Sequence, residues 1–359
     1  MNETNTSKKI NRDLLLFALA LAVLGFSIFR FWVNNSSINR IKTLVFTYSW
    51  EGNEEILKTL VSEFEELYNE DVRIRLNFIP NMTSSTAAPD GVLAGDIIAL
   101  DSLMINEFLD NELIEPEIFT LLTFFHPLYY NMDILARNGF IRPPRTRSEF
   151  LEQARTIAAA ENDVYAIALA LAQGNPQSHL RDLYSWVLAS GTTITENEIR
   201  ELINFISLLE RERLLLPGTF LMDEDEKRNA FIDAKTAFMI GTAEDMALLR
   251  QGLGDALDYT AIPVPDNYIG RPIFVAGRWN LGIAKESNNR EEALLFINFL
   301  TEHIRRLSGD WSIPASGNIY TVEDPFYLKA RELYISGDLI DDFDGISFEQ
   351  IRLDIIRNL

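Results

Sequence analysis

Cysteine is absent from the 359-residue chain. Its absence excludes disulfide bonds, thiolate metal sites, a cysteine nucleophile and a lipid-modified N-terminal cysteine. Histidine is almost as scarce, because His126, His179 and His303 are the only imidazoles and no H-E-x-x-H spacing relates them. We therefore interpret the histidines as structural or solvent-facing, and we expect neither a metal nor a cofactor.

Positive charge is also in short supply. Lysine and arginine total 32 against 53 acidic residues, which gives a formal net charge of -21 at pH 7. Such an excess repels a phosphate backbone, and no basic stripe offsets it, so the sequence argues against nucleic-acid binding. Repeats and low-complexity tracts are missing too. A chain of this length is expected to form two lobes of about 150 residues each.

One long apolar run stands near the amino terminus, at residues 14–33, and only a serine and Arg30 interrupt it. About 20 helical residues reach about 30 Å, the thickness of a bilayer's hydrocarbon core. The small residues of a cleavage site fall at 18–22 instead of at its end, which favours an uncleaved anchor over a cleaved signal. We interpret 1–13 as cytoplasmic, 14–33 as a transmembrane helix and 34–40 as a linker. The globular part would then lie on the periplasmic or extracellular side of the cell membrane.

Strand and helix patterns alternate after the linker. The predicted strands are 41–50, 72–80 and 95–101, with a helix at 54–68. This order predicts an open parallel sheet with helical crossovers, which binds ligands beyond the carboxyl ends of its strands. Those strand ends draw attention to Trp50 with Glu51, and to Asp101 with Ser102.

A second block begins near His126. Its predicted strands are 128–131, the end of 231–241, 259–265 and 272–284, and its predicted helices are 148–160, 243–251, 291–303, 325–335 and 348–356. Ser148 is the expected N-cap of the first helix. Residues 164–172 fit either a strand or a helix, and 222–227 (MDEDEK) fit a charged loop or a helix start.

Five segments carry more specific patterns: LVFTYSWEGNEEILKTLVSEFEE, GDIIALDS, PLYYNMDILARNGFIRPPRTRSEFLEQARTIA, FIDAKTAFMIGTAEDMALL and IPVPDNYIGRPIFVAGRWNLGIAKESNNREEALLFINFLTE. Their order resembles the extracellular solute-binding proteins of carbohydrate ABC importers, the family that includes the maltose- and glycerol-phosphate-binding proteins. The resemblance covers about residues 41–301. No segment is diagnostic alone, but their order and separations together are fairly specific to this family.

The resemblance implies an α/β fold of the type II periplasmic-binding-protein class, with two doubly wound lobes joined by hinge strands. Lobe I would hold residues 41–123 and 261–305, and lobe II residues 124–260 and 306–359. The lobes would close on a small solute, and a monomeric protein would pass it to ABC permease subunits. The resemblance implies no enzymatic activity.

A sugar site needs aromatic platforms and polar side chains that bind hydroxyl groups. The candidate ligand-binding residues are Trp50, Glu51, Asp101, Tyr130, Arg278 and Trp279. The tryptophans would stack on the sugar ring, and the charged residues would bind hydroxyls or a charged substituent. Core packing is the competing interpretation of each aromatic residue. Tyr129 and Tyr130 must face opposite sides of a strand, so only one of them can reach the ligand.

Two departures from the family pattern leave other functions open. The segment GTAED replaces glycines and an aromatic residue that are frequent in relatives, and AGRWN carries the bulky Arg278. A membrane-anchored receptor or scaffold that lost transport is one alternative. A glycosidase with Glu51 and Asp101 as its carboxylate pair is another.

Overall fold

The computed structural model describes residues 41–49, 54–68, 71–79, 82–173, 176–188, 195–242, 245–271, 273–308, 313–314, 324–336, 338–340 and 348–358. The predicted cytoplasmic segment, anchor and linker at 1–40 lie outside these residues, as do Trp50 and Glu51. Within the described parts, no helix combines the length and the apolar character that a membrane span requires.

A mixed sheet with the strand order β10-β4-β9-β3-β1-β2 forms the body that we call lobe I. Its strands are β1 (Lys42–Tyr48), β2 (Val72–Phe78), β3 (Ile97–Asp101), β4 (Ile114–Phe125), β9 (Ile273–Ala284) and β10 (Ile313–Pro314). β1 is parallel to β2 and β3, and β9 is antiparallel to β3 and β4. The carboxyl ends of β1 to β4 therefore lie at one edge of the sheet, where β9 begins.

Helices cover both faces of this sheet. They are α2 (Glu54–Leu67) and α12 (Arg290–Ser308) on one face, and α3 (Ser84–Ala87) and α4 (Ile105–Asp110) on the other. Apolar residues at helical spacing give α2 its buried side, where Leu60 and Phe64 are fully buried. Successive residues of β3 alternate between faces, so Ile97 packs under α2 and α12 while Ile98 packs in the cluster under α4.

A smaller sheet with the order β6-β7-β5-β8 forms lobe II. Its strands are β5 (Leu128–Asn131), β6 (Tyr165–Ala168), β7 (Thr236–Ile240) and β8 (Leu257–Thr260), and its helices include α5 (Met132–Arg137), α6 (Arg147–Ala160), α7 (Pro176–His179), α8 (Ser185–Leu188), α9 (Glu196–Arg211), α10 (Glu224–Ile232), α11 (Asp245–Leu253), α13 (Pro325–Ser336) and α14 (Phe348–Asn358). A π-helical turn, η2 (Leu180–Tyr184), joins α7 to α8. β6 and β7 are parallel, and β5 is antiparallel to β7 and β8.

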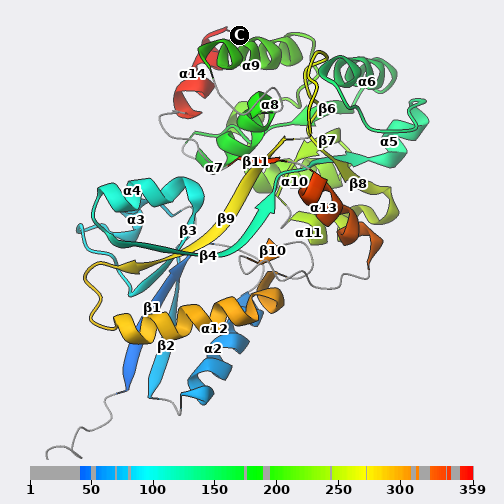
Figure 1. The fold of residues 1–359 in the computed structure, drawn as a ribbon. Coiled ribbons are helices and arrows are strands. Elements are labelled where there is room, and N and C mark those ends of the chain that lie inside the picture. The colour runs from blue at the N-terminus through cyan, green and yellow to red at the C-terminus, as the bar shows by residue number, and fades with distance from the viewer. Residues whose placement is uncertain are drawn as a thin grey trace, which may run out of the picture.

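Two long strands connect the lobes. β4 runs from lobe I into β5 through His126 and Pro127, and β9 returns from lobe II. β9 pairs with the short β11 (Asp338–Ile340) at its start and with β3 in its second half. Figure 1 shows β4 and β9 passing between the two bodies. The chain is therefore a two-lobed α/β protein.

The structure confirms most predicted elements, corrects one predicted N-cap and adds one strand that was not predicted. Residues 165–168 form a strand, which decides the open choice there, and 224–232 form a helix. The predicted N-cap Ser148 is wrong: Thr146 has the extended backbone of a cap, and its side chain accepts a hydrogen bond from the Glu149 N–H. The strand β4 was not predicted at all. Glu115 and Glu117 break its apolar pattern, and both pair with Arg290 at the start of α12.

Candidate functional site

The edges where both sheets can bind ligands meet at the crossing strands. In lobe I the carboxyl ends of β1, β2 and β3 point toward the crossing. In lobe II, Leu128 at the start of β5 pairs with Ile240 at the end of β7. The carboxyl ends of β7 and its parallel neighbour β6 therefore lie beside the point where the chain enters lobe II. Parallel strands bind ligands beyond such ends, so the candidate site lies between the two edges.

Three predicted residues come together on the lobe I side. Asp101 ends β3 and pairs directly with Trp279 in β9, and Arg278 precedes Trp279 in the same strand. Opposite residues of an antiparallel pair share a face, whereas neighbours along a strand do not. Asp101 and Trp279 thus lie on the face that α2 and α12 cover, and Arg278 lies on the other face. Trp279 is only 6% exposed, so most of its ring packs in the core in this conformation.

Asn280 connects the strands at this edge, and sequence analysis did not identify it as a candidate residue. Its amide group donates to the Arg278 carbonyl (3.3 Å) and, at 3.5 Å each, to the Leu100 carbonyl and the Ser102 hydroxyl. It also accepts a hydrogen bond from the Thr120 hydroxyl at 2.8 Å. Because Asn280 is 2% exposed, this side chain joins β3, β4 and β9 where they leave the lobe I core. Its only signal was a polar residue within an apolar strand pattern.

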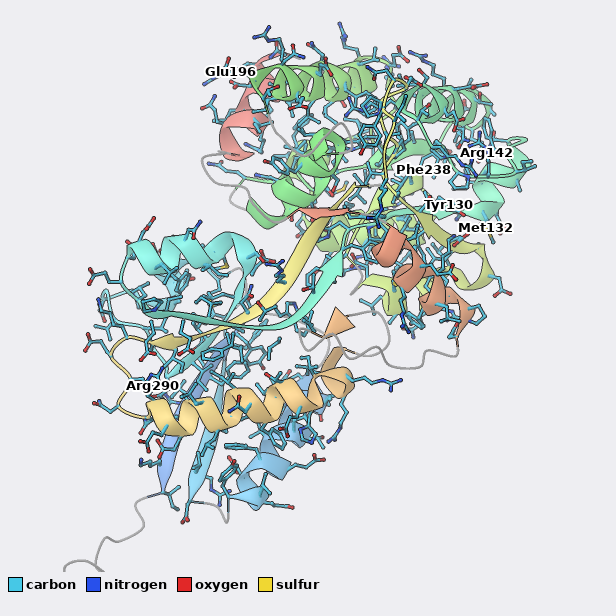
Figure 2. All side chains as sticks on the ribbon, in the orientation of Figure 1. Tyr130, Met132, Arg142, Glu196, Phe238 and Arg290 are labelled. Atoms are coloured by element: carbon cyan, nitrogen blue, oxygen red, sulfur yellow. The ribbon has the colours of Figure 1, made fainter. Side chains whose placement is uncertain are left out.

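Tyr130 is the predicted residue in lobe II, and its hydroxyl has an internal partner. It donates to Asp258 Oδ2 at 2.5 Å, and Lys329 Nζ lies 2.6 Å from Asp258 Oδ1. Burial, with this hydrogen bond, raises the pKa of Tyr130 well above its usual value. Figure 2 shows Tyr130 inside lobe II, where it is 5% exposed. The preceding Tyr129 packs in a different core cluster, as strand alternation requires.

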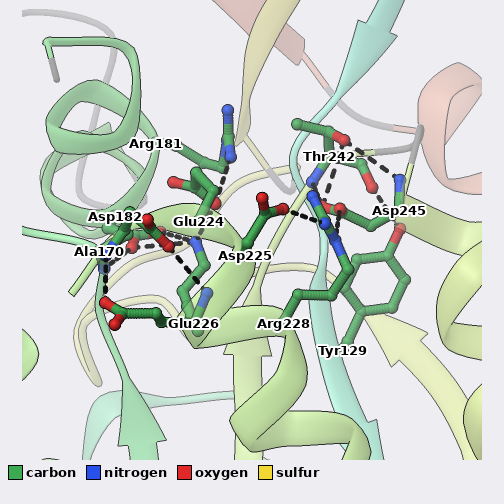
Figure 3. A network of polar contacts seen from close by, with 12 residues as sticks. Tyr129, Ala170, Arg181, Asp182, Glu224, Asp225, Glu226, Arg228, Thr242 and Asp245 are labelled. Carbon is green, nitrogen blue, oxygen red and sulfur yellow. Dashed lines mark hydrogen bonds and ion pairs between the residues drawn. The ribbon is translucent and has the colours of Figure 1, made fainter. Parts of the chain in front are cut away.

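A buried network of charges follows the carboxyl end of β6 (Figure 3). Asp182, in the π-helical turn, accepts a hydrogen bond from the Ala170 N–H at 2.5 Å and lies 2.9 Å from Lys227 Nζ. Glu224 Oε2 lies 2.8 Å from Lys227 Nζ and 2.7 Å from Arg181 Nη1. The side chains of Lys227 and Asp182 are 1% and 0% exposed, and those of Arg181 and Glu224 are 12% and 20% exposed. One end of the network is thus buried and the other reaches solvent.

A second network follows the carboxyl end of β7. Asp245 begins α11 and accepts hydrogen bonds from the Thr242 N–H at 2.7 Å and the Thr242 hydroxyl at 3.2 Å. Its other oxygen accepts a hydrogen bond from Arg228 Nε at 2.8 Å. The Tyr129 hydroxyl donates to the Thr242 carbonyl at 2.5 Å. These bonds hold the start of α11 against Thr242. Within the GTAED segment the structure describes Gly241, Thr242 and Asp245.

His126 lies where β4 passes into β5, and it is 4% exposed. Burial lowers its pKa well below 6.5, and the nearby charge of Arg181 lowers it further. Glu224 and Lys227 also act on it, so the buried network reaches the crossing itself. Among the residues that the structure describes, no group forms a hydrogen bond with His126 Nδ1.

Residues 50–303 match the family model of the bacterial extracellular solute-binding proteins. The chain belongs to this family. Its members are solute-binding proteins without enzymatic activity, which rejects the glycosidase alternative, and they act outside the cytoplasm. In the described part of the chain, no group of acidic or histidine side chains is arranged to hold a metal ion.

Named relatives agree with this assignment. A "Probable ABC transporter-binding protein" of Deinococcus radiodurans is 25% identical over 231 residues, which cover 60% of this chain and 54% of that protein. The chain thus spans about half the length of this curated relative.

Solved structures share the fold at lower identity. Maltose-bound MalE3 of T. maritima has a TM-score of 0.70 at 20% identity and covers 88% of this chain and 95% of its own. The GacH receptor of Streptomyces glaucescens, solved unliganded and with acarbose, has a TM-score of 0.70 at 16% identity, with 88% and 92% covered. A Thermotoga lettingae solute-binding protein bound to α-D-tagatose has a TM-score of 0.70 at 18% identity, with 88% and 94% covered.

Proposed function

We propose that this family member captures a carbohydrate or a related polyhydroxylated solute between its lobes and closes around it by bending at the crossing strands. The observation that carries the proposal is the convergence of the carboxyl edges of both sheets on β4 and β9. Polar side chains such as Asp101 and Asn280 lie at that edge. The three structural relatives named above were solved with maltose, acarbose or α-D-tagatose, which supports a sugar as the ligand class.

We assign the ligand contacts in lobe I to Trp50, Glu51, Asp101, Arg278 and Trp279, and those in lobe II to Tyr130. Because Trp279 and Tyr130 are 6% and 5% exposed here, their contacts with the solute depend on movement of the lobes. Carboxylate and guanidinium groups suit sugar hydroxyls because they form paired hydrogen bonds.

The proposal includes delivery to ABC permease subunits by a monomer. Its lobes are those expected from the sequence, lobe I at residues 41–123 and 261–305 and lobe II at 124–260 and 306–359, except that β10 joins the lobe I sheet and Ile262 packs in the lobe II core. It also includes a single-pass anchor at residues 14–33, whose apolar length suits a bilayer. A protease-protection assay on intact cells, with and without a tag at each terminus, tests the anchor. The layers outside the cell membrane are opened before external protease is added. A carboxyl-terminal tag that still resists the protease would show that the globular part is not outside the cytoplasm, against the proposal.

Fluorescence titration tests solute capture directly. The full chain, kept in a detergent without a sugar headgroup, is titrated with maltose, α-D-tagatose and acarbose while its tryptophan emission is followed. We expect saturable changes with at least one sugar, and a smaller affinity in Asp101→Ala and Trp279→Ala. No response of emission or of calorimetric heat to any sugar would instead favour a receptor or scaffold that lost transport.

A further inference from the structure

The buried ion pair of Asp182 and Lys227 calls for a reason other than stability. Both side chains are almost fully buried, and the ammonium group lies 2.9 Å and 3.0 Å from the two carboxylate oxygens. Removing two charges from water costs so much that apolar residues of similar size often stabilise a fold equally well. Such a pair therefore contributes little net stability, and we look for its role in the geometry that it imposes on the segments it joins.

The pair joins three segments at the lobe II edge of the candidate site. Asp182 lies in the π-helical turn that follows β6, and it also accepts the Ala170 N–H just beyond that strand. Lys227 lies in α10, the helix that precedes β7. Through Glu224 the network continues to Arg181, whose side chain is partly exposed beside the crossing residue His126. π-Helical turns are rare and occur often at functional sites.

We propose that Asp182 and Lys227 are positioning residues for solute capture: they hold the π-helical turn against α10 so that Arg181 and Glu224 present a fixed polar surface to the solute. The proposal rests on the solute-binding function proposed above. Neither buried residue touches the solute. Their effect on affinity comes from the placement of the partly exposed pair, and a site that is loosened by its supporting residues loses affinity without losing its fold.

The charge state of Asp182 gives this idea a distinctive readout. Asp182 is faced by Lys227 and Glu224 from α10, by Arg181 from its own turn and by the Ala170 N–H, and His126 lies beyond Arg181 and Glu224. Burial raises the pKa of Asp182 to about 6, although Lys227 lowers it. Burial also acts to raise the pKa of Glu224, but the charges of Arg181 and Lys227 outweigh it and lower the pKa to about 2. Glu224 therefore stays ionised near pH 6, where Asp182 titrates. Acidification through about pH 6 would therefore neutralise Asp182 first and loosen the turn.

The test measures sugar affinity as a function of pH in the full chain. Asp182→Asn removes the charge with little change of shape. Lys227→Met alone leaves the buried Asp182 carboxylate without its cation, whereas Glu224 keeps Arg181, so the double variant Asp182→Asn/Lys227→Met serves where the single one does not fold. The matched control is Asp233→Asn/Lys235→Met, an exposed ion pair just beyond α10 with a 3.5 Å separation and about 58% exposure. Maltose, α-D-tagatose and acarbose are the probes.

We expect the double variant to keep its circular dichroism spectrum and to bind the preferred sugar about ten-fold more weakly at pH 7.5. The wild type should lose affinity between pH 7 and 5, the Asp182 variants should not, and His126→Gln should still do so. Control affinity should match the wild type. Unchanged affinity in the folded double variant, or an unchanged pH profile in the Asp182 variants, overturns the positioning role alone. A wild type that binds no sugar refutes the proposed function as well.

Discussion

Gly277 is the position where the smallest possible substitution should have a large effect. It lies in β9, paired with Phe124 of β4, just before Arg278 and Trp279. A Cβ atom added there would lie 2.1 Å from Phe124 Cε2 and 2.3 Å from Phe124 Cζ. Carbon atoms in contact are normally about 3.5–4 Å apart, so the ring would have to retreat by more than about 1 Å.

The expected cost follows from that overlap. Overpacking a well-filled site costs about 1–3 kcal/mol, and replacing glycine regains about 0.4–1 kcal/mol by restricting the unfolded chain. The difference of these two ranges is about 0–2.6 kcal/mol, and the severe overlap at Phe124 places Gly277→Ala in the upper half, a loss of about 1.3–2.6 kcal/mol in the free energy of unfolding. The edge of the Phe124 ring also meets the His126 ring, with centroids 5.6 Å apart, so the displacement would reach the crossing between the lobes.

Gly282 provides the matched control in the same strand. A Cβ atom there would meet Ile114 at 3.2 Å, and the nearest atoms include the flexible end of that side chain. Gly282→Ala regains the same about 0.4–1 kcal/mol from the unfolded chain against a milder contact, so it should change the free energy of unfolding by less than about 1 kcal/mol. Urea unfolding, followed by circular dichroism with both variants in parallel, compares the two midpoints. Equal midpoints for the two variants would show that close packing at Gly277 does not constrain the crossing.

Other substitutions test separate parts of the structure. Thr146→Ala should destabilise the protein by about 1 kcal/mol and Ser148→Ala by clearly less, because Thr146 caps α6; the reverse order of unfolding midpoints would restore Ser148 as the cap. Asn280→Ala should cost about 1–3 kcal/mol by leaving buried partners unsatisfied, and a neutral result in urea unfolding would contradict the joining role of this amide. Burial lowers the pKa of His126 below 6.5, so the folded state disfavours the proton and stability falls as the pH falls through about 6.5. The raised pKa of Asp182 has the opposite effect, because its protonation below about pH 6 favours the folded state. Urea unfolding of wild type and His126→Gln at pH 7.5 and 5.5 separates the two effects. An equal loss of unfolding free energy in both proteins would rule out His126 as the cause.

Local sequence patterns were sufficient wherever an element buries one side. The spacing of Leu60 and Phe64 predicted α2, and the apolar strands that end at Tyr48 and Asp101 were predicted within a few residues. β4 was missed because more than half of its residues are not buried. Its acidic residues reach solvent and pair with Arg290, which is 173 and 175 positions away from them. A strand that leaves one core to join another carries no single repeating pattern.

The candidate site was predictable in outline but not in its contacts. The sequence singled out Asp101 and Trp279 as candidates, and the structure pairs them directly, but that pairing depends on the register of two strands far apart in sequence. The role of Lys227 could not be inferred, because a lysine within MDEDEK is expected to face solvent, and only the fold reveals that it is 0% exposed. Burial of a charge depends on partners from other segments, which local patterns do not contain.

The two lobes stabilise their facing edges with different chemistry, and this difference predicts how sugar capture depends on pH. Lobe I uses the neutral amide of Asn280, whose hydrogen bonds do not change with pH in the physiological range. Lobe II uses carboxylates and cations that are buried beside a buried histidine. Changes of external pH should therefore alter the lobe II edge while leaving the lobe I edge intact. For a protein that acts outside the cytoplasm, where pH is not buffered by the cell, sugar capture would then respond to acidity through one lobe only.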